Sequence, residues 1–274
     1  MVAEEDLQAL ILVKAAPVLT SQLQESMCVA AMTLDDAPRW VRLHPVPFRD
    51  LGDDSKFRKY QQITARVKRP RSDRRPESWT PIEGSIQLGE TIGTDQGWSR
   101  RRELVDQLGD QTMCDLVAAN RLGSGPDTPS LAVVRTAETP ELLINQRDAE
   151  QLDTWRRRAD AIAAQPSLFD DPSAPKPAFE VIPWRFRYHY RCLAPACNGH
   201  KQTIVDWEAV ALYRNIMGQR DWRDKLRQKF IDELWAPDRE TVLFVGNMEQ
   251  YPWNFLILGI FWPPGGGLQQ SMLL

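Results

Sequence analysis

The sequence predicts an α+β protein: an N-terminal antiparallel β-barrel region with inserted helices, a linker, and a C-terminal α+β module. Short apolar runs separated by polar turns fill the first part of the chain, as in small barrels. Four prolines and few apolar residues mark 165–178 as the linker. A cysteine and histidine cluster follows, between a predicted strand and a predicted helix. We therefore divide the chain into 1–164, 165–178 and 179–274.

Four short runs predict the strands of the N-terminal barrel. Residues 8–15 form an apolar run stopped by a lysine, which is typical of a buried strand. Residues 27–34 predict a second strand, closed by a turn at 35–38, and residues 40–43 and 61–68 predict two more. Strands of this length joined by polar turns favour a small antiparallel barrel.

The middle of the chain alternates helices and strands. Residues 98–120 predict a helix with an apolar stripe and a break at Gly109. Residues 131–135 and 141–145 predict two strands that close either a second barrel or the first one. Residues 149–164 then predict a helix with one apolar face.

The last third of the chain predicts a strand, two helices and two further strands. Aromatic and basic residues alternate over 184–191, which is the period of a strand. Asp206 can cap a helix that runs to about 217, and 221–234 predicts a basic amphipathic helix. The β-branched and aromatic runs 240–246 and 253–262 predict two central strands.

Between that strand and the first helix lies a candidate structural zinc site. His189, Cys192, Cys197 and His200 follow the spacing H-x2-C-x4-C-x2-H. Zinc takes four thiolate or imidazole ligands in a tetrahedron. Alternation along an unbroken strand turns His189 away from Cys192, so His189 and Asp206 compete for the fourth position. The alternative is that both cysteines are reduced core residues.

Several segments carry a resemblance to a known family. The run WVRLHPVPFRDL at 40–51, the run FRKYQQITARV at 57–67 and RPES at 75–78 occur in this order. An aromatic-x-C-x4-C-x2-H-x5-D-W-E pattern spans 190–208, and F-x-I-x-G-x-F-x-P-P spans 255–264. With these motifs the chain resembles bacterial proteins described as dual-OB-containing. The resemblance implies that the barrel region is OB-like, and it supplies no assigned activity and no catalytic residues.

Basic side chains suggest a phosphate-binding surface on this barrel. The run 66–75 holds six cations against one acid, and Arg100 and Arg101 begin the helix that follows. Lysine and arginine bind phosphates without regard to sequence, and Trp79 and Trp98 are candidate stacking platforms. The alternative is an ordinary solvated loop. The candidate residues of the run are Arg66, Lys68, Arg69, Arg71, Arg74 and Arg75.

The linker contains a candidate docking peptide. Residues 165–169, QPSLF, resemble the segment with which bacterial DNA-maintenance proteins bind the sliding clamp. Leu168 and Phe169 are adjacent apolar anchors, and Gln165 offers a polar contact. The alternative is that Leu168 and Phe169 hold the linker against a neighbouring domain.

Composition and charge limit the classes of protein to which the chain can belong. The 274 residues carry a net charge of −3, so nucleic-acid affinity has to come from local patches. The isolated Cys28 and Cys114 exclude a secreted disulfide framework, and we expect a cytoplasmic protein. No apolar run is long enough to span a bilayer and no signal peptide is evident, so we expect no membrane partner.

We expect a non-enzymatic nucleic-acid-binding or adaptor protein with a structural zinc, bound to DNA or RNA. The resemblance suggests DNA maintenance or phage defence. A first alternative is a structural subunit that contacts only protein. A second is a metal-dependent nuclease that uses Asp206 and Glu208 with Asp221 or Asp224. The phosphate-binding loop and nucleophile-elbow motifs are absent from the sequence.

Overall fold

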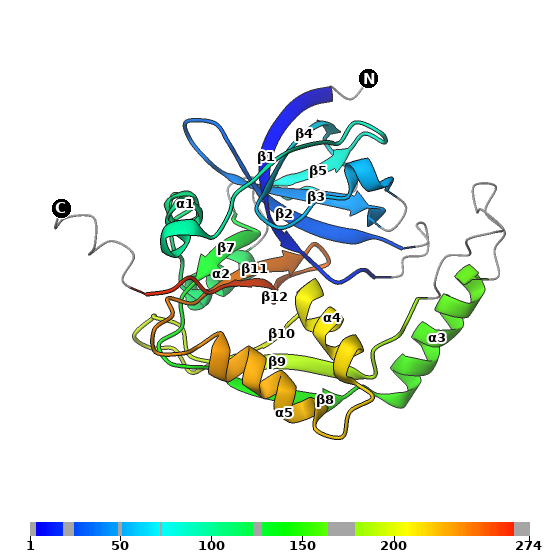
Figure 1. Cartoon of the computed structure of the whole chain (residues 1–274), viewed down its shortest axis with the longest axis vertical. Helices are drawn as coiled ribbons and strands as arrows, with labels where there is room; N and C mark the ends of the chain where they lie inside the picture. The colour runs from blue at the N-terminus through cyan, green and yellow to red at the C-terminus, as the bar shows by residue number, and fades with distance from the viewer. Residues whose placement is uncertain are drawn as a thin grey trace.

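The structure is a computed structural model of the whole chain (Figure 1). It describes residues 4–18, 25–48, 51–71, 73–122, 128–163 and 179–265. These residues form an α+β fold with a closed five-stranded barrel in the N-terminal part, which confirms the predicted fold class. In this described part, every helix is too short or too polar to cross a membrane.

The N-terminal barrel follows the neighbour order β1-β2-β3-β5-β4 and closes because β1 also pairs with β4. All pairings inside it are antiparallel except the one between β3 and β5, and β6 adds to β4 outside the closed ring. The four strands expected from the sequence are present, and two short ones, β5 and β6, were not expected. The strands are β1 (Glu4–Lys14), β2 (Met27–Thr33), β3 (Trp40–Val46), β4 (Gln61–Lys68), β5 (Ser78–Pro81) and β6 (Gln87–Thr91).

Strand β1 is buried on both faces, which explains its continuous apolar run. Ala9 and Ile11 point into the barrel with the residues of its core. Leu10 and Leu12 point outward and join a second cluster with strands of the C-terminal half. All four side chains are at most 1% exposed. The outer face of this part of the barrel is therefore a packing surface.

Two helices connect the halves of the molecule. Helix α1 (Asp95–Asp106) starts with left-handed residues at 96–98 and becomes regular afterwards. Helix α2 (Met113–Arg121) begins at Thr112, whose side chain accepts a hydrogen bond from the Asp115 backbone at 3.2 Å. Gly109, with a φ of 66°, lies in the break between them, as expected.

The C-terminal half contains two three-stranded sheets. Their orders are β10-β9-β8 and β12-β11-β7. Bridges Thr136↔Cys192 and Ile204↔Ile257, the latter parallel, connect the two sheets. The strands are β7 (Leu131–Val134), β8 (Glu141–Gln146), β9 (Trp184–Tyr190), β10 (His200–Thr203), β11 (Val242–Met248) and β12 (Tyr251–Phe261).

This pairing corrects the domain division expected from the sequence. Strand β8 pairs along its whole length with β9, although α3 (Ala149–Ala163) and the proline-rich segment lie between them. Strand β7 pairs with β11, so neither β7 nor β8 belongs to the first barrel. The segment 165–178 lies outside the described residues, and it connects two strands of one sheet. Strand pairing depends on hydrogen-bonding partners, which the composition of a connection does not reveal.

Helices α4 (Trp207–Ile216) and α5 (Trp222–Arg227) cover the buried face of β9 (Figure 1). Helix α5 continues into a π-helical segment at 228–233. Its apolar face brings Leu226 and Phe230 against Tyr188, whose hydroxyl donates to the Phe230 carbonyl. The alternation predicted for β9 is thus confirmed, with its aromatic residues inside.

The two halves share one apolar interface. Strands β7, β11 and β12 lie between the first barrel and the sheet of β8–β10 (Figure 1). Trp40 of the barrel packs edge-on against Phe244 of β11, with ring centres 5.7 Å apart. A Cβ on Gly246 would come within 3.2 Å of the Arg42 guanidinium, so the Arg42 side chain of the barrel packs close to the backbone of β11. The halves therefore fold against each other as one packed unit.

A buried ion pair reinforces this interface. Lys59 Nζ lies 3.0 Å from both carboxylate oxygens of Asp206 and 3.1 Å from Glu208 Oε2. The Lys59 side chain is 12% exposed and that of Asp206 is 2% exposed. Burial lowers the pKa of Lys59, but the two carboxylates outweigh burial and the net shift is upward. Removing either partner would leave a buried charge unpaired.

We predict that Lys59→Ala lowers the free energy of unfolding by about 3–5 kcal/mol, because Asp206 loses its counter-ion in a buried site. Urea unfolding measures the change. Arg39→Ala is the matched control, since the Arg39–Asp35 pair is exposed and a loss of about 1 kcal/mol or less is expected. Equal losses for the two variants would show that the ion pair does not support the interface.

Candidate metal centre

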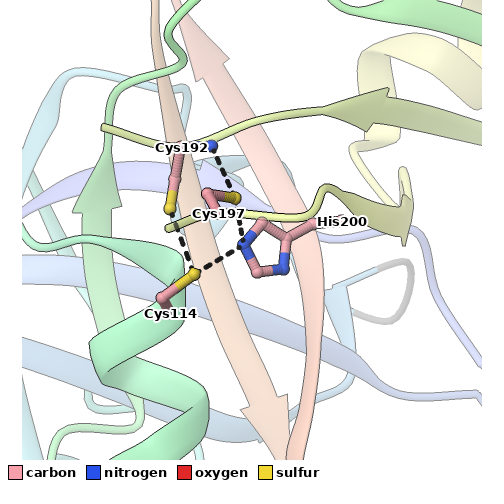
Figure 2. Close-up of side chains that lie close together, drawn as sticks. All are labelled: Cys114, Cys192, Cys197 and His200. Atoms are coloured by element: carbon pink, nitrogen blue, oxygen red, sulfur yellow. Dashed lines mark hydrogen bonds between the residues drawn. The ribbon is translucent and has the colours of Figure 1, made fainter. Parts of the chain in front are cut away.

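Four side chains from a helix, a loop and a strand converge in the C-terminal half (Figure 2). Cys114 lies in the first turn of α2, and Cys192 and Cys197 lie in the loop between β9 and β10. His200 is the first residue of β10. One ligand atom from each residue lies within 4.8 Å of all the others. The group contains three sulfurs and one imidazole, which is a ligand set for a metal ion.

The distances between these atoms fit tetrahedral coordination. The sulfurs of Cys192 and Cys114 are 3.7 Å apart. Nε2 of His200 lies 3.5 Å from the Cys114 sulfur and 3.2 Å from the Cys197 sulfur. An ion bound about 2.3 Å from each sulfur would give sulfur–sulfur edges of about 3.8 Å. The four residues can therefore hold one ion with little rearrangement.

Backbone hydrogen bonds and a glycine with positive φ hold the Cys197 sulfur in position. The backbone N–H groups of Cys192 and Gly199 donate to the Cys197 sulfur, at 3.3 and 3.4 Å. Gly199 has a φ of 99°, a conformation that favours glycine. A Cβ at Gly199 would lie 3.2 Å from Nε2 of His189. The two N–H groups would stabilise negative charge on a bound thiolate.

Burial and hydrogen bonds shift the pKa values of three of the four side chains. Burial raises the pKa of Cys114 to about 12, and the neighbouring Cys192 and Cys197 add to this shift. Burial also opposes ionisation of Cys192, but hydrogen bonds including one from the Ala194 backbone bring its pKa below the usual value. Burial lowers the pKa of His200, which leaves the imidazole neutral near pH 7 and able to bind a metal. As ligands of a metal ion, the cysteines would bind as thiolates.

The structure brings together three of the predicted ligands and replaces the fourth. His189 points to the other face of β9, where its side chain is 41% exposed and Nδ1 lies 3.5 Å from Glu141. The alternation along the strand therefore excludes it from the cluster. Asp206, the other candidate, is held by Lys59. Cys114 takes the fourth position.

Cys114 carried no local signal in the sequence. It lies 78 residues before Cys192 and stands alone on its helix. Only the packing of α2 beside β12 and the cysteine loop brings it to the site. Among the described residues, this is the one group of three or more cysteines, histidines or acids placed to share a metal ion.

Three of the predicted phosphate-binding arginines make contacts with other residues of the protein. Arg75 pairs with Asp73 at 2.6 Å and donates to the Asn247 carbonyl at 2.6 Å. The guanidinium of Arg69 lies 3.7 Å from the centre of the Trp79 ring. Arg101 stacks on Tyr60, 3.9 Å from the ring centre. These contacts stabilise the fold, since each cation already has a partner.

The other five candidates are exposed. Arg66 lies 3.5 Å from Glu4, and Arg100 lies 3.1 Å from Glu103. Within the described part of the chain, no ion pair involves the remaining three, which are Lys68, Arg71 and Arg74.

The expected stacking platforms have structural contacts instead. Trp79 is 9% exposed and lies beneath Arg69. Trp98 packs against Phe261 and Trp262, with ring centres 5.8 and 5.3 Å away. The predicted docking residues Gln165, Leu168 and Phe169 lie outside the described residues.

The fold and the cluster define a two-part α+β protein with a candidate Cys3His metal centre in its second part. Residues 109–274 match the family described as Domain of unknown function (DUF8757), and the chain belongs to this family. Residues 5–107 match a second family, Domain of unknown function (DUF8758). A search of curated proteins finds no match. The two family matches meet where the sheet pairings also divide the chain, before α2.

We predict that Cys114→Ser abolishes metal binding whereas His189→Ala retains about one metal ion per chain. Cys114 belongs to the group of four ligands, and His189 lies outside it. Elemental analysis of the purified proteins measures this. Cys28→Ser is the matched cysteine control and is expected to retain the metal. Retention by Cys114→Ser together with loss by His189→Ala would contradict the assignment.

A second prediction concerns Asp73, which lies in the basic loop with its side chain 11% exposed. Burial raises the pKa of Asp73, but hydrogen bonds from Arg75 and Ser78 outweigh burial and bring it to about 2. A depressed pKa contributes stability above the unfolded value near 4, and this contribution is lost as the pH falls toward 2. We expect Asp73→Asn to lose about 2 kcal/mol at pH 6. Urea unfolding should show this gap closing toward pH 2, and a gap independent of pH would refute the prediction.

Proposed function

We propose that this protein is a non-enzymatic, zinc-stabilised nucleic-acid-binding protein with two OB-like barrels. The first barrel supports the OB assignment through its strand order. An OB fold is a five-stranded Greek-key barrel. Here β1 pairs with β4 through residues 4–10 and with β2 through residues 9–14. The parallel pairing of β3 with β5 completes the ring.

The second half repeats this order, and the repeat is the observation that carries the proposal. Strands β7 and β8 together act as one first strand, since β7 pairs with β11 and β8 pairs with β9. Strand β9 then pairs with β10, and β11 pairs with β12. The parallel bridge Ile204↔Ile257 corresponds to the parallel contact between β3 and β5. The same connectivity in both halves supports a dual-OB protein, in agreement with the resemblance of its motifs.

The donor set of the metal centre supports zinc in a structural role. Three thiolates and one imidazole suit zinc better than hard cations, which prefer oxygen ligands. Four protein ligands complete the tetrahedron and leave no position for a reactive water. The ion would connect α2 to the loop between β9 and β10, segments separated by 78 residues. Zinc would therefore hold the second barrel together.

The contacts of the candidate carboxylates favour a non-enzymatic protein over a nuclease. Asp206 and Glu208 both bind Lys59, which neutralises the charge that magnesium would need. Asp206 is also 1% exposed and caps α4 by accepting a hydrogen bond from the Glu208 backbone at 3.0 Å. A substrate phosphate could not reach a metal at this position.

OB-like barrels commonly bind oligonucleotides, which favours a nucleic-acid ligand over a protein-only role. The resemblance to dual-OB-containing proteins suggests an adaptor in DNA maintenance or phage defence. The peptide at 165–169 would provide such an adaptor with a docking segment for a sliding clamp. A structural subunit that contacts only protein remains the second candidate.

We predict that the zinc-loaded protein binds a labelled single-stranded 20-mer with salt-dependent affinity. Neutralising about three phosphates gives a slope of about −2 in log K against log salt, or more than a tenfold loss between 50 and 200 mM. Fluorescence anisotropy of DNA and RNA oligonucleotides measures this and distinguishes the two polymers. The absence of salt-sensitive binding to either one would favour the protein-only subunit.

A further inference from the structure

The hairpin that joins β11 and β12 carries an exposed aromatic patch. Tyr251 and Trp253 are each 50% exposed, and Met248 beside them is 38% exposed. The two aromatic rings are 6.3 Å apart at an angle of 76°. Most other aromatic side chains of the described chain are buried or half-buried. Two adjacent aromatic residues at the surface form a candidate contact site.

This hairpin is held in a defined position. The Asn247 side chain donates to the Pro252 carbonyl at 2.8 Å and to Asn120 Oδ1 at 3.0 Å. Asn247 itself is 4% exposed, and Met248 pairs with Tyr251 across the hairpin. The aromatic side chains are therefore presented by an anchored backbone, which reduces the entropy lost when a ligand binds.

The basic loop of the first barrel lies directly against this hairpin. Arg75 donates to the Asn247 carbonyl at 2.6 Å and fixes the loop there. Arg74 and Arg71 belong to the same loop, and their side chains are exposed. The acidic residue of the loop, Asp73, is neutralised by Arg75. The hairpin turn carries one acidic residue, Glu249. The aromatic patch thus has a basic neighbour from the other half of the molecule.

In OB folds, ligands commonly lie on the face of strands 2 and 3 and on the loops between strands 1 and 2 and strands 4 and 5. In the first barrel the corresponding face is blocked. Arg42 of β3 is 2% exposed and donates to the Ser130 carbonyl at 2.9 Å. The loop 69–77 and the hairpin 248–251 both join the fourth strand of a barrel to the fifth. Among the described residues, an exposed surface of this kind lies where these two loops meet.

We propose that single-stranded nucleic acid binds across this junction, which rests on the proposed function. Unpaired bases stack on Tyr251 and Trp253, while Arg71 and Arg74 neutralise the adjoining phosphates. Stacking requires base faces that a duplex keeps covered, so the site selects single strands. DNA and RNA share this chemistry, and oligonucleotides of both kinds distinguish them.

The aromatic half of the site is tested with paired substitutions. The double variant Tyr251→Leu with Trp253→Leu keeps an apolar surface and removes the rings. We expect its affinity for single-stranded (dT)20 and (U)20 to fall about tenfold or more by anisotropy. The variant Tyr251→Phe with Trp253→Phe retains the rings and should stay within about threefold of the original protein. Both variants retain the full charge of the loop.

The basic half is tested by Arg71→Ala with Arg74→Ala. Loss of two phosphate contacts on a single strand should reduce the steepness of log K against log salt by about 1.4. Arg220→Ala with Arg227→Ala is the charge-matched control, because both arginines are exposed near α5, away from the hairpin. This control should leave the salt slope nearly unchanged.

The outcomes separate this site from the broader function. If the original protein binds (dT)20 or (U)20 with salt dependence but the leucine pair binds equally well, the junction is not the site and the proposed function stands. If neither polymer binds, the proposed function fails and this site fails with it. Equal affinity for a 20-base-pair duplex, lost in the leucine pair, would overturn the selection for single strands.

Discussion

Three cysteine sulfurs and one imidazole lie within 4.8 Å of one another and can hold one metal ion between them. Without an ion, burial would keep the Cys114 thiol protonated beside the apolar core. With it, α2 is fastened to the loop after β9. That fastening positions the helix that packs beside β12, and β12 in turn forms the interface with the first barrel. A metal ion bound here would therefore support the packing of the second half.

The segments that resemble dual-OB-containing proteins lie mostly at the interface between the halves. Lys59 of the K-Y-Q segment pairs with Asp206 of the D-W-E segment. Glu77 of the R-P-E-S segment accepts hydrogen bonds from the backbone and the hydroxyl of Ser130, both at 2.8 Å. Arg75 of the same segment reaches Asn247. These motifs thus supply contacts that join the two halves of the protein.

Patterns among residues close in the sequence correctly predicted the features that depend on local structure. Alternation identified the buried aromatic face of β9. It also indicated that an unbroken strand turns His189 away from Cys192, although His189 was still predicted as a candidate fourth ligand. Short spacing identified Cys192, Cys197 and His200. Contacts between distant segments could not be predicted in this way. Cys114 joins the site only through the packing of α2. The sequence indicates a free cation at Arg75, but Asp73 and Asn247 bind it in the structure. The proline-rich segment looked like a domain boundary because strand pairing across it has no local signature.

X-ray absorption at the zinc edge of the purified protein shows whether these four side chains hold zinc. We expect a zinc spectrum with about three sulfur neighbours at about 2.3 Å and one nitrogen neighbour at about 2.0 Å. A shell of nitrogen and oxygen atoms alone, or protein that contains no zinc after purification without chelators, would contradict it.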